Sequence, residues 1–222
     1  MYESYQYRAG SLTVQLLLLD TRQWRSDLRE GSDCPRLPHS EHGPYCEMPQ
    51  NSTLLGEEQW AWLADELAAA ADVRIVASSI GVAAADHGWE SWALFPHEQS
   101  RLSSLIASTH ASGVVFISGD IHYGEVSVLK DGLAYPLYDA TSSGLTHTAR
   151  WPTPPLPNVK RIREPVTTDN FGLITIEREA SDPLVQIELR DQYGLAGATV
   201  SLKLSELQAA PLSATTGDAA FL

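Results

Sequence analysis

The segment of residues 113–125 constrains this chain more than any other. After a glycine, four apolar residues, most of them β-branched, occupy positions 114–117. A run of this length is too short for a helix and is typical of a strand buried on both faces. Asp120 and His122 follow just past its carboxyl end. Open α/β sheets place their ligands at this end of their strands, so the segment is the first candidate for a functional site.

Asp120 and His122 offer a hard carboxylate oxygen and a borderline imidazole nitrogen. This pair suits zinc, manganese or iron better than copper. The structural alternative is a turn in which the aspartate caps backbone N–H groups. Two side chains also cannot hold a metal by themselves, since catalytic zinc takes three protein ligands and octahedral ions take more. A metal site here would need further donors.

Composition narrows the range of partners. The 222 residues are 43% apolar and 19% charged, as expected for a soluble globular protein of one domain or one and a half, and their net charge is −13. Nucleic acid and anionic membranes select basic patches, so neither is an expected partner. No apolar run is long enough to span a bilayer. An anionic substrate would need metal ions to offset the negative field locally.

The cysteines and the N-terminal residues are the parts of the sequence that bear on the cellular location of the protein. Cys34 and Cys46 lie in one polar loop and could form a disulfide in an oxidising compartment. His39 and His42 lie between them and keep a metal site open as an alternative. The N-terminal residues lack the basic and apolar regions of a secretion signal, so the sequence leaves the location undetermined.

The first half of the chain alternates between strands and helices. Apolar runs and alternating patterns predict strands at 2–9, 12–19, 73–77 and 114–118. Apolar residues at helical spacing predict helices beginning at residues 57 and 96. Residues 25–54 are polar and are expected to form a long loop. The unit from 73 to 118 is then a βαβ unit with a right-handed crossover. If strand 12–19 is also parallel, Asp20, Ser79 and Asp120 line one sheet edge, and the loop 80–95 overhangs it.

Two residues of this half, Asp20 and Gln59, have expected structural roles. Asp20 follows a buried strand, and we favour a structural role for it, in a turn or as a partner of Arg22, over metal binding. Gln59 lies in the first turn of the helix that begins at residue 57, where a capping partner would sit.

From about residue 124 the pattern changes to short strands separated by turns, without helices. This predicts antiparallel strands in a second sheet layered on the first, with a hairpin at Asp131-Gly132 and an irregular, proline-rich stretch at 150–166. We expect one domain over residues 1–206 and a flexible tail over 207–222. The predicted fold class is α/β (α+β), with layered mixed β-sheets flanked by helices.

The remaining histidines divide by context. His97 and His110 accompany a helix and are expected to be surface or core residues, whereas His87 lies in the overhanging loop. His147 ends a run of small hydroxyl residues, which could contact a phosphate or satisfy a buried turn. The sequence has no Gly-x-Ser-x-Gly elbow and no glycine-rich phosphate loop, and neither cysteine is in an activating context. Metal-assisted hydrolysis is therefore the chemistry that the residues favour.

Seven segments of the chain stand out in order: Leu19-Asp-Thr-Arg-Gln, Leu55-Gly-Glu-Glu-Gln-Trp-Ala-Trp-Leu63, His87-Gly-Trp-Glu-Ser-Trp, Phe95-Pro-His-Glu98, Ser118-Gly-Asp-Ile-His122, Thr141-Ser-Ser-Gly-Leu-Thr-His147 and Asn170-Phe-Gly-Leu173. Together they resemble the signatures of the alkaline phosphatase D (PhoD-like) family of calcineurin-like metallophosphoesterases. The resemblance covers roughly residues 2–205, and the ordered set is far more specific than any one segment.

The resemblance implies two facing mixed sheets flanked by helices, with a site for two or more divalent or trivalent metal ions (Fe, Ca, Mn or Zn) at strand ends. Asp120 and His122 match the last metal-binding motif, with one residue reaching each metal. His147 and Arg22 match positions that support or line the pocket. The implied substrates are small phosphomonoesters or phosphodiesters, and the implied location of the full-length family is periplasmic or secreted.

Two departures qualify this resemblance. The family's N-terminal ligands have no counterpart here, and residues 78–79 are serines where many metallophosphoesterases place a histidine. We therefore expect the C-terminal portion of a phosphatase, a sandwich lacking its N-terminal half and weak or inactive alone. It would pair with that half or self-associate through exposed sheet edges. The alternatives are a non-catalytic remnant or binding module, and a single-metal protein that uses Asp120, His122, His87 and His147.

Overall fold

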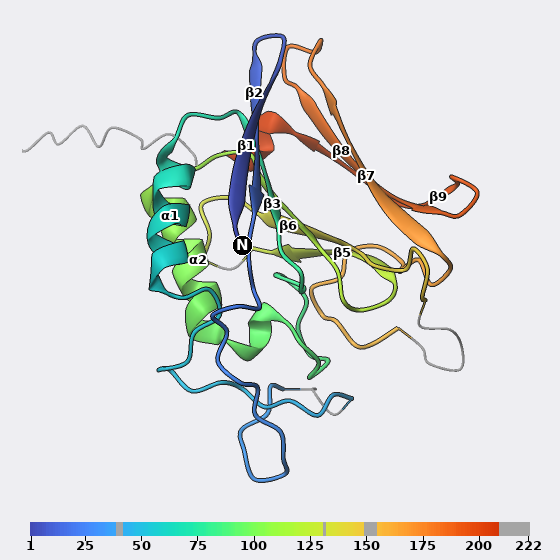
Figure 1. Ribbon diagram of the computed structural model, residues 1–222. Helices are drawn as coiled ribbons and strands as arrows, with labels where there is room; N and C mark the ends of the chain where they lie inside the picture. The colour runs from blue at the N-terminus through green and yellow to red at the C-terminus, as the bar shows by residue number, and fades with distance from the viewer. Residues whose placement is uncertain (39–41, 131, 149–154, 209–222) are drawn as a thin grey trace, which may run out of the picture.

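The computed structural model describes residues 1–38, 42–130, 132–148 and 155–208. Figure 1 shows their arrangement as two β-sheets with helices on one side. The first sheet contains β1 (Glu3–Ala9), β2 (Leu12–Leu18), β3 (Val73–Ala77), β4 (Val114–Ser118), β5 (Gly124–Leu129) and β6 (Leu137–Ser142), and the second contains β7 (Asn170–Glu177), β8 (Leu184–Asp191) and β9 (Ala196–Lys203). The helices are α1 (Glu57–Ala68) and α2 (Pro96–Ser108), with short 3₁₀ turns η1 (Trp92–Leu94) and η2 (Leu204–Leu207).

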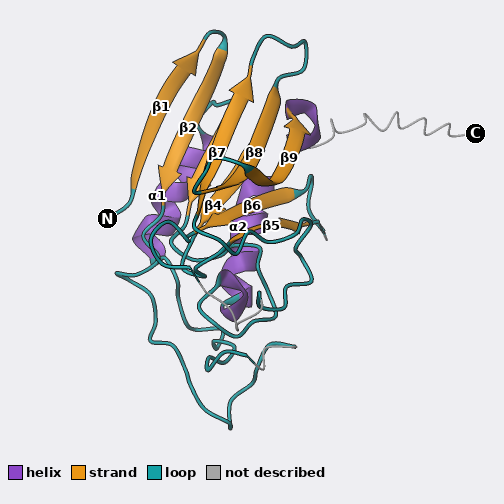
Figure 2. Cartoon of the chain, turned by 90° about the vertical axis from the view of Figure 1, so that its right-hand side faces the viewer, coloured by secondary structure: helices purple, strands orange, loops and turns teal. Residues whose placement is uncertain are grey.

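The first sheet has the strand order β1-β2-β3-β4-β6-β5. Strands β2, β3 and β4 are parallel, which confirms the predicted arrangement, and Leu16, Ile75 and Val115 lie in register across them. Their carboxyl ends meet at one edge, which we call the carboxyl edge. Figure 2 shows the long loops gathered beyond the carboxyl end of β2.

The prediction for residues 124–142 was wrong in one respect. Strands β5 and β6 were expected in an antiparallel second sheet, but they extend the first sheet, and β6 runs parallel to β4. The physical reason is burial: β6 lies between β4 and β5, and its polar Asp139 and Thr141 are buried there. Only β7, β8 and β9 form the expected antiparallel sheet.

The six-stranded sheet is the middle of three layers. Figure 1 shows α1 and α2 on one face and the sheet β7-β8-β9 on the other. Both helices begin where the sequence predicted, and their apolar faces bury Trp60, Leu63 and Leu102 in the core. The two helix starts are joined by the buried Glu98, which accepts hydrogen bonds from Leu54 N (2.7 Å) and from the indole of Trp60. Fold class and layering therefore agree with the prediction of layered mixed sheets flanked by helices.

The domain prediction placed a flexible tail at 207–222. Leu207 is buried, and its carbonyl accepts a hydrogen bond from Gly113 N at 2.7 Å. Residues 209–222 lie outside the described residues, as does Asp131 of the predicted hairpin. Among the described segments, no helix is both long and apolar enough to cross a membrane.

Candidate functional site

Asp120 and His122 occupy a tight turn between β4 and β5. Both residues have positive φ angles, 75° for Asp120 and 63° for His122, and both side chains are exposed. Left-handed backbone at non-glycine residues costs free energy and is concentrated at functional sites. The hydroxyl of Ser143 accepts a hydrogen bond from His122 N at 2.9 Å, which holds the turn against the end of β6.

His147 joins this turn from the segment that follows β6. Its imidazole lies 4.9 Å from that of His122, centroid to centroid, with the rings nearly perpendicular at 86°. Asn170 of β7 supports the segment, since its backbone N donates to Gly144 O at 3.0 Å. A side chain on Gly144 would place its Cβ 2.2 Å from the Asn170 amide, so glycine is required there. The second sheet thereby positions His147 beside His122.

Asp20 acts as a turn former, the role that we favoured. Its carboxylate accepts hydrogen bonds from Arg22 N and Gln23 N, both at 2.9 Å. Gln59 is not the capping partner that the sequence predicted: its side chain donates to Asp20 O and accepts from Asp20 N, both at 2.8 Å. The prediction was wrong because this amide pairs with the chain after β2 and leaves its own helix end without a side-chain cap.

Arg22 leaves this turn toward the overhanging loop 80–95. Its guanidinium lies 3.1 Å from the carboxylate of Glu90, and Arg25 binds the same oxygen at 2.8 Å. Sequence reasoning missed Glu90, because an acidic residue between two tryptophans carries no signal of its partners.

The buried carboxylate of Asp139 fixes this loop to the sheet. It accepts hydrogen bonds from Val82 N at 2.7 Å, Ala83 N at 2.9 Å and Ser118 Oγ at 2.7 Å. Burial raises the pKa of Asp139, while these donors oppose the rise. Sequence reasoning missed Asp139 as well; the available signal was the one charged residue of strand β6.

The charged groups of the carboxyl edge act on Asp120. Desolvation raises the pKa of Asp120, and the negative charge of Glu90 raises it further. Arg22, His122 and Arg25 lower it. Arg22 and His122 therefore lie close enough to Asp120 to act on its charge, and His147 contacts His122.

His87 has a different environment. Its side chain is 2% exposed, and its Nδ1 accepts a hydrogen bond from Trp89 N at 3.1 Å. Burial lowers the pKa of His87 to about 4. The described residues contain no group of three or more His, Cys, Asp and Glu side chains placed to hold a metal ion. The structure thus does not gather the four side chains of the single-metal alternative.

The buried imidazole of His87 predicts a loss of stability in acid. Between the unfolded pKa near 6.5 and the folded pKa of about 4, only the unfolded state binds the proton. The free energy of unfolding should therefore fall by roughly 3 kcal/mol as the pH drops through this window. Urea unfolding of the chain and of His87→Asn at several pH values measures this; an equal loss in both proteins would contradict it.

The described side chains at the carboxyl edge are of the types that bind metal ions, but they are too few to form a complete metal site. One carboxylate and two imidazoles match the donors that zinc, manganese and iron use. A catalytic site needs at least three protein ligands for each zinc, and the described residues do not group that many. A complete metal site would therefore require donors other than those that the structure describes.

The polar loop 25–54 is joined to the overhanging loop. Cys34 and Cys46 form a disulfide with their Cα atoms 5.9 Å apart, so the cysteines are not metal ligands. Next to the disulfide, Tyr45 N donates to Gly88 O at 3.1 Å. His39, part of the metal alternative for this loop, lies outside the described residues.

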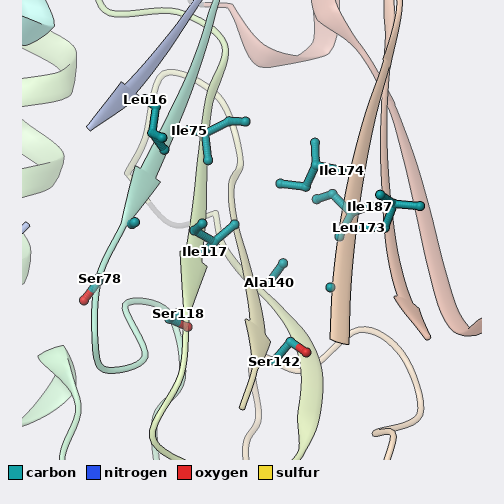
Figure 3. A pocket seen from close by; sticks show the side chains of 12 residues that line it. Leu16, Ile75, Ser78, Ile117, Ser118, Ala140, Ser142, Leu173, Ile174 and Ile187 are labelled. Carbon is teal, nitrogen blue, oxygen red and sulfur yellow. The ribbon is translucent and has the colours of Figure 1, made fainter. Parts of the chain in front are cut away.

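A separate cavity of about 430 Å³ lies between the two sheets. Figure 3 shows Ile75 and Ile117 on one side of it and Ile174 and Ile187 on the other. The described residues that line it are apolar or small, and they carry no charge. The cavity therefore offers serine hydroxyls but no charged group, whereas the carboxyl edge carries Asp120 and Arg22.

Comparison with known proteins shows the family of this chain. The family model of PhoD-like phosphatases matches residues 1–149. A curated relative, alkaline phosphatase D of Bacillus subtilis (strain 168), is 32% identical over 131 residues, which are 55% of this chain and 21% of that protein. The chain thus spans about a fifth of the relative's length.

Two solved structures share the fold. The structure of PhoD matches with a TM-score of 0.63 at 20% identity, over 90% of this chain and 40% of that chain. GAP50, the anchor in the inner membrane complex of Plasmodium, matches with a TM-score of 0.54 at 14% identity, over 91% of this chain and 54% of that chain. Because the family model covers more than half of its residues, the chain belongs to the PhoD-like phosphatase family.

Proposed function

We propose that this chain contributes the carboxyl-edge part of a metal-dependent phosphoester hydrolase site. The observation that supports this most directly is the pairing of His122 with His147 beside Asp120, in a turn with strained backbone. These residues come from the end of β4 and from the segment after β6, so the fold alone brings them together. Small phosphomonoesters and phosphodiesters are the proposed substrates.

Each side chain has a role in this proposal. Asp120 and His122 would hold metal ions of the Fe, Ca, Mn or Zn type. Bound ions neutralise phosphoryl oxygens and activate water in such enzymes. The guanidinium of Arg22 can bind two phosphoryl oxygens in a bidentate manner. The exposed imidazole of His147 can transfer a proton to the leaving oxygen or hold a phosphoryl oxygen by a hydrogen bond.

The small number of metal-binding side chains among the described residues supports a second candidate function, a non-catalytic module. The described residues do not assemble three or more metal-binding side chains, which favours a non-catalytic module for the chain by itself. The two candidates differ in whether further donors complete the site. In the hydrolase, they come from residues other than those that the structure describes.

The disulfide bears on the cellular location of the protein, and the edge strand β7 bears on its association with other chains. The disulfide between Cys34 and Cys46 supports a location outside the cytoplasm, because such bonds persist in oxidising compartments. Strand β7 forms a sheet edge, and its Phe171 and Leu173 are exposed. Exposed edges with apolar side chains favour pairing with another chain, so we propose self-association or a protein partner at β7.

Metal analysis together with hydrolysis tests the proposed function. We expect the dialysed chain to retain less than one metal per chain, and added Mn²⁺ or Zn²⁺ to support slow hydrolysis of bis(p-nitrophenyl) phosphate. His122→Ala should abolish this turnover, and His110→Ala, beyond the end of α2, should not change it. Absence of any metal-dependent turnover would favour the non-catalytic module. Two tightly bound metals with rapid turnover would show that the chain assembles a complete site.

A further inference from the structure

Trp89 and Tyr45 form an exposed aromatic pair in the loops beside the carboxyl edge. The side chain of Trp89 is 44% exposed. Its ring centroid lies 6.3 Å from that of Tyr45, and the two rings are nearly perpendicular at 84°. This is the edge-to-face arrangement that aromatic rings prefer. Tyr45 therefore supports the indole from one side while a large part of the indole stays open to solvent.

Further contacts join the backbones of the two loops that carry Tyr45 and Trp89. Tyr45 N donates to Gly88 O at 3.1 Å, directly before Trp89 in the chain. A Cβ at Gly43 would lie 2.0 Å from the same carbonyl, so the two loops approach as closely as glycine allows. The disulfide at Cys46 closes the loop next to Tyr45. A platform that is rigid before binding loses little conformational entropy when a ligand stacks on it.

The residue after Trp89 connects this pair to the phosphate end of the site. Glu90 binds the guanidinium groups of Arg22 and Arg25, at 3.1 and 2.8 Å. Arg22 is 57% exposed, so its remaining donors are available to an anion. The exposed indole of Trp89 thus comes from the residue next in the chain to Glu90, the carboxylate that binds the exposed cation of Arg22.

We propose that Trp89 is a stacking platform for the alcohol part of the substrate, and that the preferred phosphoesters carry a planar aromatic ring there. This proposal rests on the proposed function for the phosphate end, which Arg22 would contact. The ring lies on the indole, and the phosphate lies toward Asp120 and His122. Aryl and nucleoside esters share this chemistry, because both present a flat π-face to the indole.

Two matched pairs of ligands isolate the stacking contact. Phenyl phosphate and cyclohexyl phosphate carry the same charge on rings of similar size, and only the first is planar and aromatic. Adenosine 5′-monophosphate and ribose 5-phosphate form the corresponding nucleoside pair. Titration of the full chain, followed by ligand NMR, gives each affinity and the ring-current shift of the ligand protons.

We expect phenyl phosphate to bind about five- to tenfold more tightly than cyclohexyl phosphate, with its ring protons shifted upfield. Trp89→Leu should reduce this preference to about twofold or less, and Trp89→Phe should retain most of it. Tyr193→Leu removes an exposed aromatic side chain from the turn between β8 and β9 and should leave the preference unchanged. A larger preference within the nucleoside pair would assign the platform to nucleoside esters, and a larger one within the phenyl pair to aryl esters.

The outcomes separate this inference from the proposed function. An unchanged preference in Trp89→Leu, or no preference in the unaltered chain, overturns the stacking platform even if the chain hydrolyses phosphoesters. A preference that depends on Trp89 in a chain without turnover supports the platform and counts against the hydrolase. Thermal unfolding of each variant confirms that a loss of binding does not come from a loss of fold.

Discussion

Replacing Arg161 by methionine should lower the free energy of unfolding by about 3–5 kcal/mol. The guanidinium of Arg161 binds the fully buried carboxylate of Glu125 at 2.7 Å, and Asn158 donates to its other oxygen at 3.0 Å. Burial raises the pKa of Glu125, while Arg161 lowers it. Without Arg161, the carboxylate would remain buried without a counter-charge, which is more costly than the loss of the pair as a whole.

This ion pair also bears on the candidate site. Glu125 lies three residues after His122, and Arg161 also lies over the ring of the intervening Tyr123 at 6.0 Å. The pair therefore anchors the strand that follows the turn of Asp120 and His122. Loosening it should increase the mobility of that turn.

Urea unfolding of matched variants measures the effect of Arg161. The double change Arg161→Met with Glu125→Gln removes the unpaired charge and should recover part of the loss. Glu57→Gln breaks the exposed pair with Arg101, in which Glu57 is 79% exposed, and should cost less than about 1 kcal/mol. Equal losses in Arg161→Met and Glu57→Gln would show that burial of Glu125 is not the source of the effect.

Asp139→Ala should also cost about 3–5 kcal/mol, because it leaves several buried donors without an acceptor. Val82 N, Ala83 N and the hydroxyl of Ser118 all donate to this carboxylate. The contacts with Val82 and Ala83 hold the beginning of the loop 80–95. We therefore expect faster hydrogen exchange across this loop, including Glu90, in addition to the loss of stability.

Ser118→Ala is the matched control for Asp139. It removes the hydrogen bonds of the Ser118 hydroxyl to Asp139 and to the hydroxyl of Thr141 but leaves the two backbone donors satisfied, so it should cost about 1–2 kcal/mol and leave exchange in the loop unchanged. Urea unfolding and amide exchange of both variants distinguish the two roles. Unchanged exchange across residues 80–95 in Asp139→Ala would refute the anchoring role of the carboxylate.

The sequence predicted those parts of the fold that depend on local pattern. Short, largely apolar runs predicted β2, β3 and β4, and apolar residues at helical spacing predicted α1 and α2. On the condition that β2 is parallel to β3 and β4, the sequence also predicted that Asp20, Ser79 and Asp120 share an edge. The hydrogen bond between the hydroxyls of Thr21 and Ser79 agrees with this arrangement.

The strand order and the contacts between residues distant in the sequence could not be predicted from local patterns. Strand β6 lies between β4 and β5 although β5 precedes it in the chain, and no local pattern specifies that order. The contact between His122 and His147 depends on this order, since β6 carries the chain to His147. Glu90 and Asp139 were missed because their partners lie far away in the sequence and only the folded loops bring them together.

Paramagnetic broadening by Mn²⁺ tests the central claim most directly. The chain has seven histidines, and the ring signals of each report how close the added ion binds. If the carboxyl edge is the metal-binding part of a phosphoesterase site, the signals of His122 and His147 broaden first, and those of His97 and His110 remain sharp. Asp120→Ala should weaken this selective broadening. Equal broadening of all histidines, or earlier broadening at His97 or His110, would contradict the assignment of the site.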